Sequence, residues 1–215
     1  MIDLGATCDE ALSVYAIIPT ADGALLSPGR GKELVAVGPI AALTGRGALQ
    51  GDLERRALAH DRIVLRALAA CSSVVPFRLG ASLPGRRAVT RVLERNRSSL
   101  AALLHRFAGR VEMGLKIKLP DDERWSGAVP AGALERQLAG IHRLTADSED
   151  RREQVRHGSA GVVFEGSYLV PRAKIESFWA RTAALRAKNP ALPMLASGPF
   201  APYSFCGWLH RESLA

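Results

Sequence analysis

The spacing of apolar residues changes several times along this chain, and this change limits the fold more than any other feature of the sequence. Short β-prone runs, such as residues 13–18, alternate with stretches in which apolar residues recur every three or four positions. The first pattern is typical of strands and the second of helices with one buried face. Some of the strands follow one another through turns. The pattern therefore predicts an α+β fold in which helices cover mainly antiparallel sheets.

The first half of the chain contains two helical stretches among the strand patterns. Asp52 is a suitable N-cap for the first helix, and Gly109 is a suitable stop after the second. Pro76 cannot donate to a strand ladder, so the extended segment around it is expected at a sheet edge or at the start of a strand. Strands are expected at residues 13–18, 34–37, 74–79 and 111–119, with a weaker one near 24–26 or 40–43, and helices at 52–71 and 86–107.

The second half repeats this mixture after a polar, proline-led segment at residues 120–124. A helix carrying Leu134, Leu138, Ile141 and Leu144 is expected to continue as a solvated helical arm through the charge-rich residues 147–156. A strand at 162–170, a helix from Ile175 that ends before Asn189-Pro190, and an organised segment at 192–205 follow. The polar break predicts two small α+β domains, residues 1–119 and 120–215.

Composition narrows the class of protein. The chain has 215 residues, of which 47% are hydrophobic, so it can bury a core. Its formal net charge is +8 and comes mostly from arginine, which suits contacts with acidic proteins, nucleic acid or an anionic membrane. No stretch approaches the roughly 18 apolar residues of a membrane span, and the N-terminus lacks a signal-peptide pattern. These features predict a cytoplasmic protein without a membrane partner.

Much of the excess charge lies on the predicted helix at residues 86–110. There Glu94 is the one acidic residue among seven arginines, and Arg87, Arg91 and Arg95 form an i, i+4 row away from the apolar stripe. A solvated helix face and a docking site for an acidic protein are both consistent with this row. Nucleic-acid binding through residues 86–110 is the alternative. It normally uses aromatic residues among the basic ones, and the only aromatic nearby, Phe107, lies on the apolar stripe. A protein partner is therefore favoured over nucleic acid.

Nothing in the sequence indicates an enzyme, a metal site or a cofactor. Cys8, Cys71 and Cys206 are widely separated and form no CxxC pair, so we expect small buried hydrophobic residues. His60 lies on the apolar stripe of its helix, where a core or interface role is expected. The glycines at 80–85 lack the spacing and the lysine of a phosphate-binding loop. A Cys–His enzyme is a remote further alternative.

The most distinctive string is Gly198-Pro199-Phe200-Ala201-Pro202-Tyr203-Ser204-Phe205. Two prolines restrict the backbone, and three aromatic residues offer a large contact area at low entropic cost. The segment can seal an edge of the core, or it can expose an anchor for a partner. Phe200, Tyr203 and Phe205 are therefore partner-binding candidates, together with the arginine row.

This string resembles the C-terminal motif Gly-Pro-Trp-Pro-Pro-Tyr-Ser-Phe of the gas vesicle accessory proteins of the GvpL/GvpF family, with Phe200 for Trp and Ala201 for Pro. The resemblance extends along nearly the whole chain. Each motif is weak alone, but their order is fairly specific. The further motifs are Val14-Tyr15-Ala16-Ile17, His60 before Val64-Leu65, Val75-Pro76-Phe77-Arg78-Leu79-Gly80, Val111-Glu112-Met113 and Ser167-Tyr168-Leu169-Val170.

The resemblance implies a non-enzymatic protein that acts in gas vesicle assembly as a minor component. It implies two α+β domains with ferredoxin-like elements, and contacts with the small, very hydrophobic major shell protein and with other accessory proteins. It also implies a location at the gas vesicle, on the gas-facing side of the shell. The chain is short for the family, through a reduced helical region after Asp121.

Overall fold

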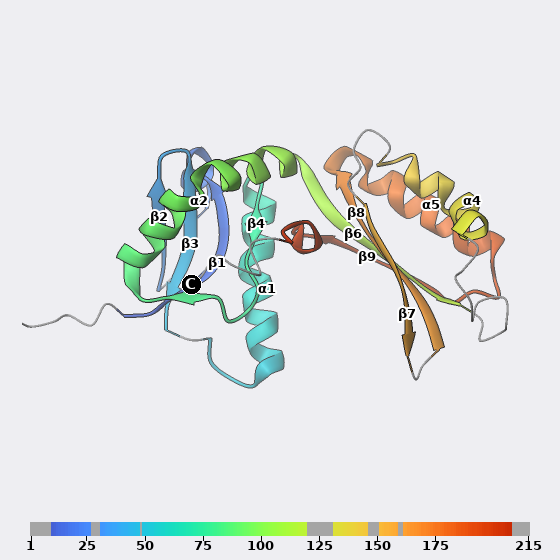
Figure 1. Cartoon of the computed structure of the whole chain (residues 1–215), viewed down its shortest axis with the longest axis horizontal. Coiled ribbons are helices and arrows are strands. Elements are labelled where there is room, and N and C mark those ends of the chain that lie inside the picture. The colour runs from blue at the N-terminus through green and yellow to red at the C-terminus, as the bar shows by residue number, and fades with distance from the viewer. Residues whose placement is uncertain are drawn as a thin grey trace, which may run out of the picture. The chain divides into compact units, whose positions relative to one another are not determined.

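The computed structural model describes residues 10–26, 31–47, 49–119, 131–145, 151–158 and 161–207. The chain divides into two compact units, one formed by Met1–Ala108 with Cys206–Ala215 and the other by Gly109–Phe205. Each unit contains an antiparallel sheet with helices packed on it (Figure 1). The predicted α+β class is confirmed. The ferredoxin-like elements stay a prediction.

The first unit is built on a five-stranded sheet in the order β2-β3-β1-β4, with β5 pairing with β1, and every pair is antiparallel. Residues 40–43 are the correct alternative for the weaker strand. The other alternative, 24–26, is wrong because Thr20–Leu25 form the short 3-10 helix η1. The bounds are β1 Leu12–Pro19, β2 Lys32–Val37, β3 Ile40–Arg46, β4 Val75–Pro76 and β5 Ser82–Leu83.

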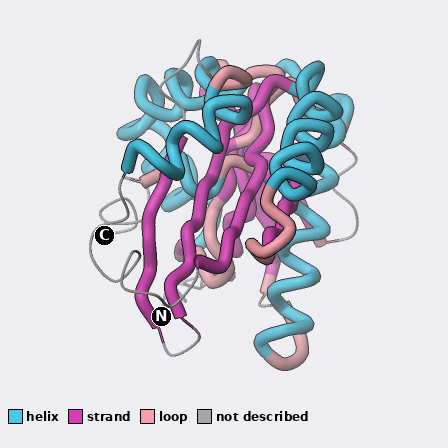
Figure 2. Tube along the Cα trace, turned by 90° about the vertical axis from the view of Figure 1, so that its right-hand side faces the viewer, coloured by secondary structure: helices cyan, strands magenta, loops and turns pink. Residues whose placement is uncertain are grey.

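Two helices, α1 (Leu53–Ala70) and α2 (Gly85–Phe107), pack on this sheet and confirm the two helices predicted in this half. The Asp52 side chain caps α1 by accepting a hydrogen bond of 2.8 Å from the backbone N–H of Arg55. The N-terminal part of α1 projects beyond the strands (Figure 1 and Figure 2), which leaves Leu53 exposed. Gly109, at φ +66°, follows the end of α2 in a left-handed conformation that favours glycine.

The second unit is built on a four-stranded antiparallel sheet in the order β7-β8-β6-β9. The helices α4 and α5 lie on the same side of this sheet (Figure 1). Tyr168 and Phe178 pack against each other in this layer, with ring centroids 6.0 Å apart. The bounds are β6 Arg110–Leu119, α4 Ala131–His142, β7 Arg151–Gly158, β8 Gly161–Pro171, α5 Ile175–Lys188 and β9 Met194–Phe200.

The predicted helical arm at residues 147–156 is wrong. From Arg151 onwards the described part of this segment is strand β7, which pairs with β8 from Arg151↔Tyr168 to Gly158↔Gly161. The local sequence is charged and lacks an apolar alternation, so it does not predict a strand. The strand is stabilised by its pairing with β8. Residues 146–150 lie outside the described part of the chain.

Strand β6 lies between the change of unit and the predicted domain boundary. The compact units change between Ala108 and Gly109, whereas the predicted boundary follows Leu119, at the other end of β6. Since β6 pairs with both β8 and β9, its residues belong to the second sheet. The polar segment 120–124, which suggested the boundary, lies outside the described residues.

Among the helices described, none is long and apolar enough to span a membrane.

Candidate functional site

The carboxylate of Glu112, on β6, is the centre of the candidate site. It is only 8% exposed and accepts two hydrogen bonds from Ser204. The backbone N–H of Ser204 donates to Oε2 at 2.9 Å, and its hydroxyl donates to Oε1 at 2.6 Å. Ser167 Oγ, on β8, lies 3.1 Å from Ser204 Oγ and donates to it, because the Ser204 proton is directed at Glu112. The carboxylate thus holds the segment after β9 against the sheet.

This contact joins three of the short motifs that carry the family resemblance. Glu112 belongs to Val111-Glu112-Met113, Ser167 opens Ser167-Tyr168-Leu169-Val170, and Ser204 lies in the C-terminal string. Strands β6, β8 and β9 bring them together because β6 pairs with both of the others (Figure 1). Sequence reasoning named these motifs but missed the contact between them. Glu112 and Ser204 are 92 residues apart, so no local pattern signals their pairing.

The three aromatic candidates of the C-terminal string have different environments. Phe205, in the short 3-10 helix η3 (Tyr203–Phe205), is 2% exposed, and Tyr203 is half-buried. Phe200, at the end of β9, is 37% exposed. The string therefore has one ring in the core, that of Phe205, and one partly exposed ring, that of Phe200. Their role as partner contacts stays a prediction.

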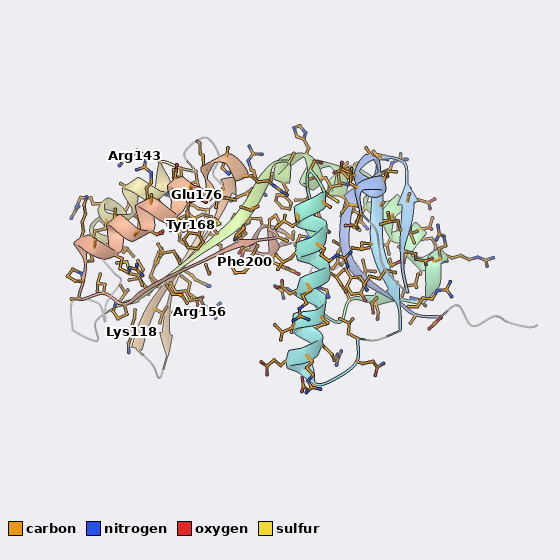
Figure 3. The ribbon with its side chains drawn as sticks, turned by 180° about the vertical axis from the view of Figure 1, so that it is seen from behind. Lys118, Arg143, Arg156, Tyr168, Glu176 and Phe200 are labelled. Atoms are coloured by element: carbon orange, nitrogen blue, oxygen red, sulfur yellow. The ribbon has the colours of Figure 1, made fainter. Side chains whose placement is uncertain are left out.

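The side of the second sheet away from α4 and α5 forms an open face. Figure 3 shows Phe200, Arg156 and Lys118 on the side of the strands opposite to Arg143 and Glu176. A shallow groove of about 590 Å³ lies on this face. Its floor is a row of paired residues that crosses all four strands, Ser197–Gly114–Ser167–Arg152.

Charges on the open face are partly paired. Glu165 contacts Lys116 Nζ at 2.9 Å and Arg156 Nε at 3.0 Å, and it accepts a hydrogen bond of 3.0 Å from the side-chain amide of Gln154. The hydrogen bond from Lys116 and the two cations lower the pKa of Glu165. Arg152, at the end of the floor row, has no ion-pair or hydrogen-bond partner among the described residues. The groove is therefore basic on the side of β7.

On the covered face, Glu153 anchors α4 to the sheet. Its Oε1 atom accepts a hydrogen bond of 2.7 Å from the Tyr168 hydroxyl and lies 2.8 Å from His142 Nε2. Tyr168 is fully buried, and desolvation together with the nearby Glu153 charge raises the pKa of its phenol. These contacts hold α4 and β8 together, and they show a polar network that sequence reasoning did not find.

The arginine row lies in the first unit, on α2, away from the Glu112 contact in the sequence. Arg87, Arg91 and Arg95 are all exposed and have no ion-pair partner among the described residues. Arg86 differs, since its guanidinium lies 3.4 Å from Glu33. The row thus has the exposure that a docking face needs, and its role stays a prediction.

His60, Cys71 and Cys206 have the environments expected of core residues. His60 is 5% exposed, and its Nε2 atom lies 2.8 Å from the carbonyl oxygen of Phe77. Burial lowers the pKa of His60, because it disfavours the charged form of the ring. Cys71 and Cys206 are buried, and Cys8 lies outside the described residues.

In chemical terms, the Glu112 contact is an anchor. Its hydroxyl and carboxylate lack an imidazole to transfer a proton, since no histidine lines the groove in the described part of the chain. Within the same ranges, no group of three or more His, Cys, Asp or Glu side chains is placed to hold a metal ion.

Comparison with known proteins defines the class. The sequence profile of the family "Gas vesicle synthesis protein GvpL/GvpF" matches residues 11–132 and 130–207. These matches cover most of the chain, including the Glu112 contact. The chain belongs to this family, whose members are gas vesicle proteins and not a known class of enzymes.

Individual relatives agree with this membership. The chain is 29% identical to gas vesicle protein F2 of Halobacterium salinarum over 149 residues, which cover 68% of this chain and 66% of that protein. It is 26% identical to gas vesicle protein L of a Streptomyces species, with 93% of this chain and 94% of that protein covered.

A solved structure shares the fold. The crystal structure of GvpF from Anabaena sp. PCC7120 matches with a TM-score of 0.69 at 17% identity, and the match covers 92% of this chain and 96% of that one.

Proposed function

We propose that this chain is an assembly or minor structural protein that binds the major gas vesicle shell protein and other accessory proteins while vesicles form. One observation carries the proposal: three motifs of the family resemblance meet at the Glu112–Ser204 contact, which fixes the C-terminal string beside an open sheet face. The buried carboxylate accepts charge-assisted hydrogen bonds from the backbone N–H and the hydroxyl of Ser204, and these bonds fix the backbone position of Ser204. The order that it imposes presents Phe200 at a constant place on the open face.

The proposal is tested by recovering partners with the full chain. We expect a tagged chain, produced together with the other vesicle proteins, to recover the shell protein, and we expect removal of its gene to abolish or deform the vesicles. Normal vesicles without the gene, combined with no recovered shell protein, would contradict the proposal.

Two substitutions test whether the partner protein contacts the open face. Phe200→Ala should reduce the recovery of partners, because Phe200 is 37% exposed on the open face. Val155→Ala is the matched control, since Val155 has a similar exposure of 38% but pairs with Phe164 and so faces the helix side of the sheet. An equal loss of partners in both variants would count against the open face.

The proposal assigns no enzymatic step and no cofactor. A location at the gas vesicle follows from it, and the gas-facing side of the shell, which the resemblance implies, stays a prediction. Recovery of the chain from intact, thoroughly washed vesicles measures whether it remains with the finished shell.

A further inference from the structure

We infer that the open face of the second sheet binds an amphipathic α-helix of a partner protein, with the apolar side of that helix against Phe200 and an acidic side toward Arg152. The inference rests on the proposed function in one respect, namely that the partner is another gas vesicle protein. It adds the shape and the charge of the segment that is recognised.

The groove has the width of a helix. Its two sides on β6 are marked by Glu112 and Lys116, which lie four positions apart, about 13 Å along a strand. A helix with its side chains is about 10–12 Å across. The floor between these sides consists of small residues, because Gly114 has no side chain and the Ser197 hydroxyl lies over it, where a Cβ atom on Gly114 would be only 2.6 Å from Ser197 Oγ. A helix can therefore approach the sheet closely over this row.

The apolar part of the face lies on β9. Leu195 is 62% exposed and pairs with Lys116, and Phe200 is 37% exposed and pairs with Glu112, so both belong to the open face. An antiparallel sheet commonly leaves one face to water, and such a face is polar. Phe200 also lines the groove, and exposed aromatic side chains are a residue type enriched at protein–protein interfaces.

The basic part of the face has one residue on β7, at the opposite edge of the sheet from β9, and one on β6, next to β9. Arg152 has no partner among the described residues, and Lys118, on β6, is exposed and likewise has none there. Glu165 is already balanced by Lys116 and Arg156. Glu112 is 8% exposed and held by Ser204, and Glu153 contacts Tyr168 and His142. The exposed charges that lack a partner among the described residues are therefore those of Arg152 and Lys118, and both match acidic side chains. Nucleic acid fits less well, because Phe200 is the one aromatic side chain among the described residues that line the groove, and single-stranded nucleic acid is normally bound by several stacking aromatics.

The test uses the full chain and two synthetic helical peptides that share one leucine stripe. One peptide carries glutamates along one side of the stripe, and the other carries lysines at the same positions. We expect the acidic peptide to bind at least about tenfold more tightly, with a preference that weakens as salt is added. The variant Arg152→Glu with Lys118→Glu should abolish or reverse the preference, and Phe200→Ser should weaken the binding of the acidic peptide.

Arg143→Glu is the matched control, because Arg143 is an exposed arginine on the helix side of the same unit (Figure 3). It should leave the preference unchanged. Equal affinity for the two peptides, or a preference that survives the double charge reversal, would overturn the inference. If the full chain still recovers the shell protein in that case, the proposed function stands and the helix-binding face does not. If the full chain shows the peptide preference but recovers no vesicle protein, the helix-binding face stands and the proposed function does not.

Discussion

The substitution Ser204→Ala tests whether the Glu112 contact stabilises the second unit. The change removes the hydroxyl that donates to Glu112 Oε1 at 2.6 Å, and it also removes the acceptor of the Ser167 hydroxyl. The backbone N–H of Ser204 still donates to the carboxylate. The variant therefore takes away one charge-assisted bond and leaves the other in place.

The expected magnitude follows from the burial of the acceptor. A hydrogen bond to a charged group contributes about 1.5–3 kcal/mol, and because Ser204 itself is exposed we expect the lower end, about 1.5 kcal/mol. For a unit of this size, that loss lowers the melting temperature by about 6–12 °C. Glu112→Gln should cost a similar amount, and the double variant should cost less than the sum of the two, with a coupling of about 1 kcal/mol.

Ser72→Ala provides an unusually close control. Ser72 also donates both its backbone N–H and its hydroxyl to one carboxylate, that of Asp22, at 2.8 Å and 2.6 Å. That pair is exposed, so its loss should cost about 0.5 kcal/mol or less. Urea unfolding followed by circular dichroism measures each variant. Equal costs for Ser204→Ala and Ser72→Ala, or additivity of Glu112→Gln with Ser204→Ala, would refute the argument from burial.

Three further predictions concern residues outside this contact. Because burial lowers the pKa of His60 below its ordinary 6.5, the unfolded chain binds a proton more readily than the folded one. Stability should therefore fall as the pH drops from about 6.5 toward the folded-state pKa, and His60→Gln should flatten that step in a series of unfolding titrations. Charge reversal at Arg87, Arg91 and Arg95 should leave the circular dichroism spectrum and the melting temperature unchanged while it weakens a partner contact in pull-down. Unchanged binding would make the row an ordinary solvated face. A steep salt dependence of binding to DNA or RNA would favour the nucleic-acid alternative. Phe205→Ala should destabilise the chain by about 3–5 kcal/mol in urea unfolding, because the ring is 2% exposed, and a loss below about 1 kcal/mol would contradict its place in the core.

Elements with a buried side were predictable from the sequence. Helix α1 shows its apolar stripe in every turn of its second half and begins at a residue type that caps helices, so both its face and its start followed from local pattern. The strand around Pro76 was expected at an edge because proline has no N–H, and β4 is the last strand in the order of its sheet. In both cases the residues that determine the structure, the cap and apolar stripe of α1 and the proline of β4, lie within the element itself.

Strand β7 and the Glu112 contact were not predictable, because their causes lie far away in the chain. The residues Arg151, Arg152 and Glu153 give no apolar alternation, and the strand is held by its pairing with β8. Glu112 lies on a strand whose pattern indicates only that it is buried, and its partner is a serine 92 residues later. The family resemblance included the motif of Glu112 and the string of Ser204 without indicating that these two residues touch.

The charged edge formed by β7 has a consequence for contacts between copies of this chain. An edge strand has unpaired backbone groups that a second strand can use, and charged side chains are one way in which proteins discourage this. Every residue from Arg151 to Arg156 is exposed, and three of these six are arginines. A neighbouring copy that extended the sheet here in parallel and in register would place arginines beside one another in a shared ladder. The β7 edge of the second unit therefore discourages such in-register growth between copies of this chain.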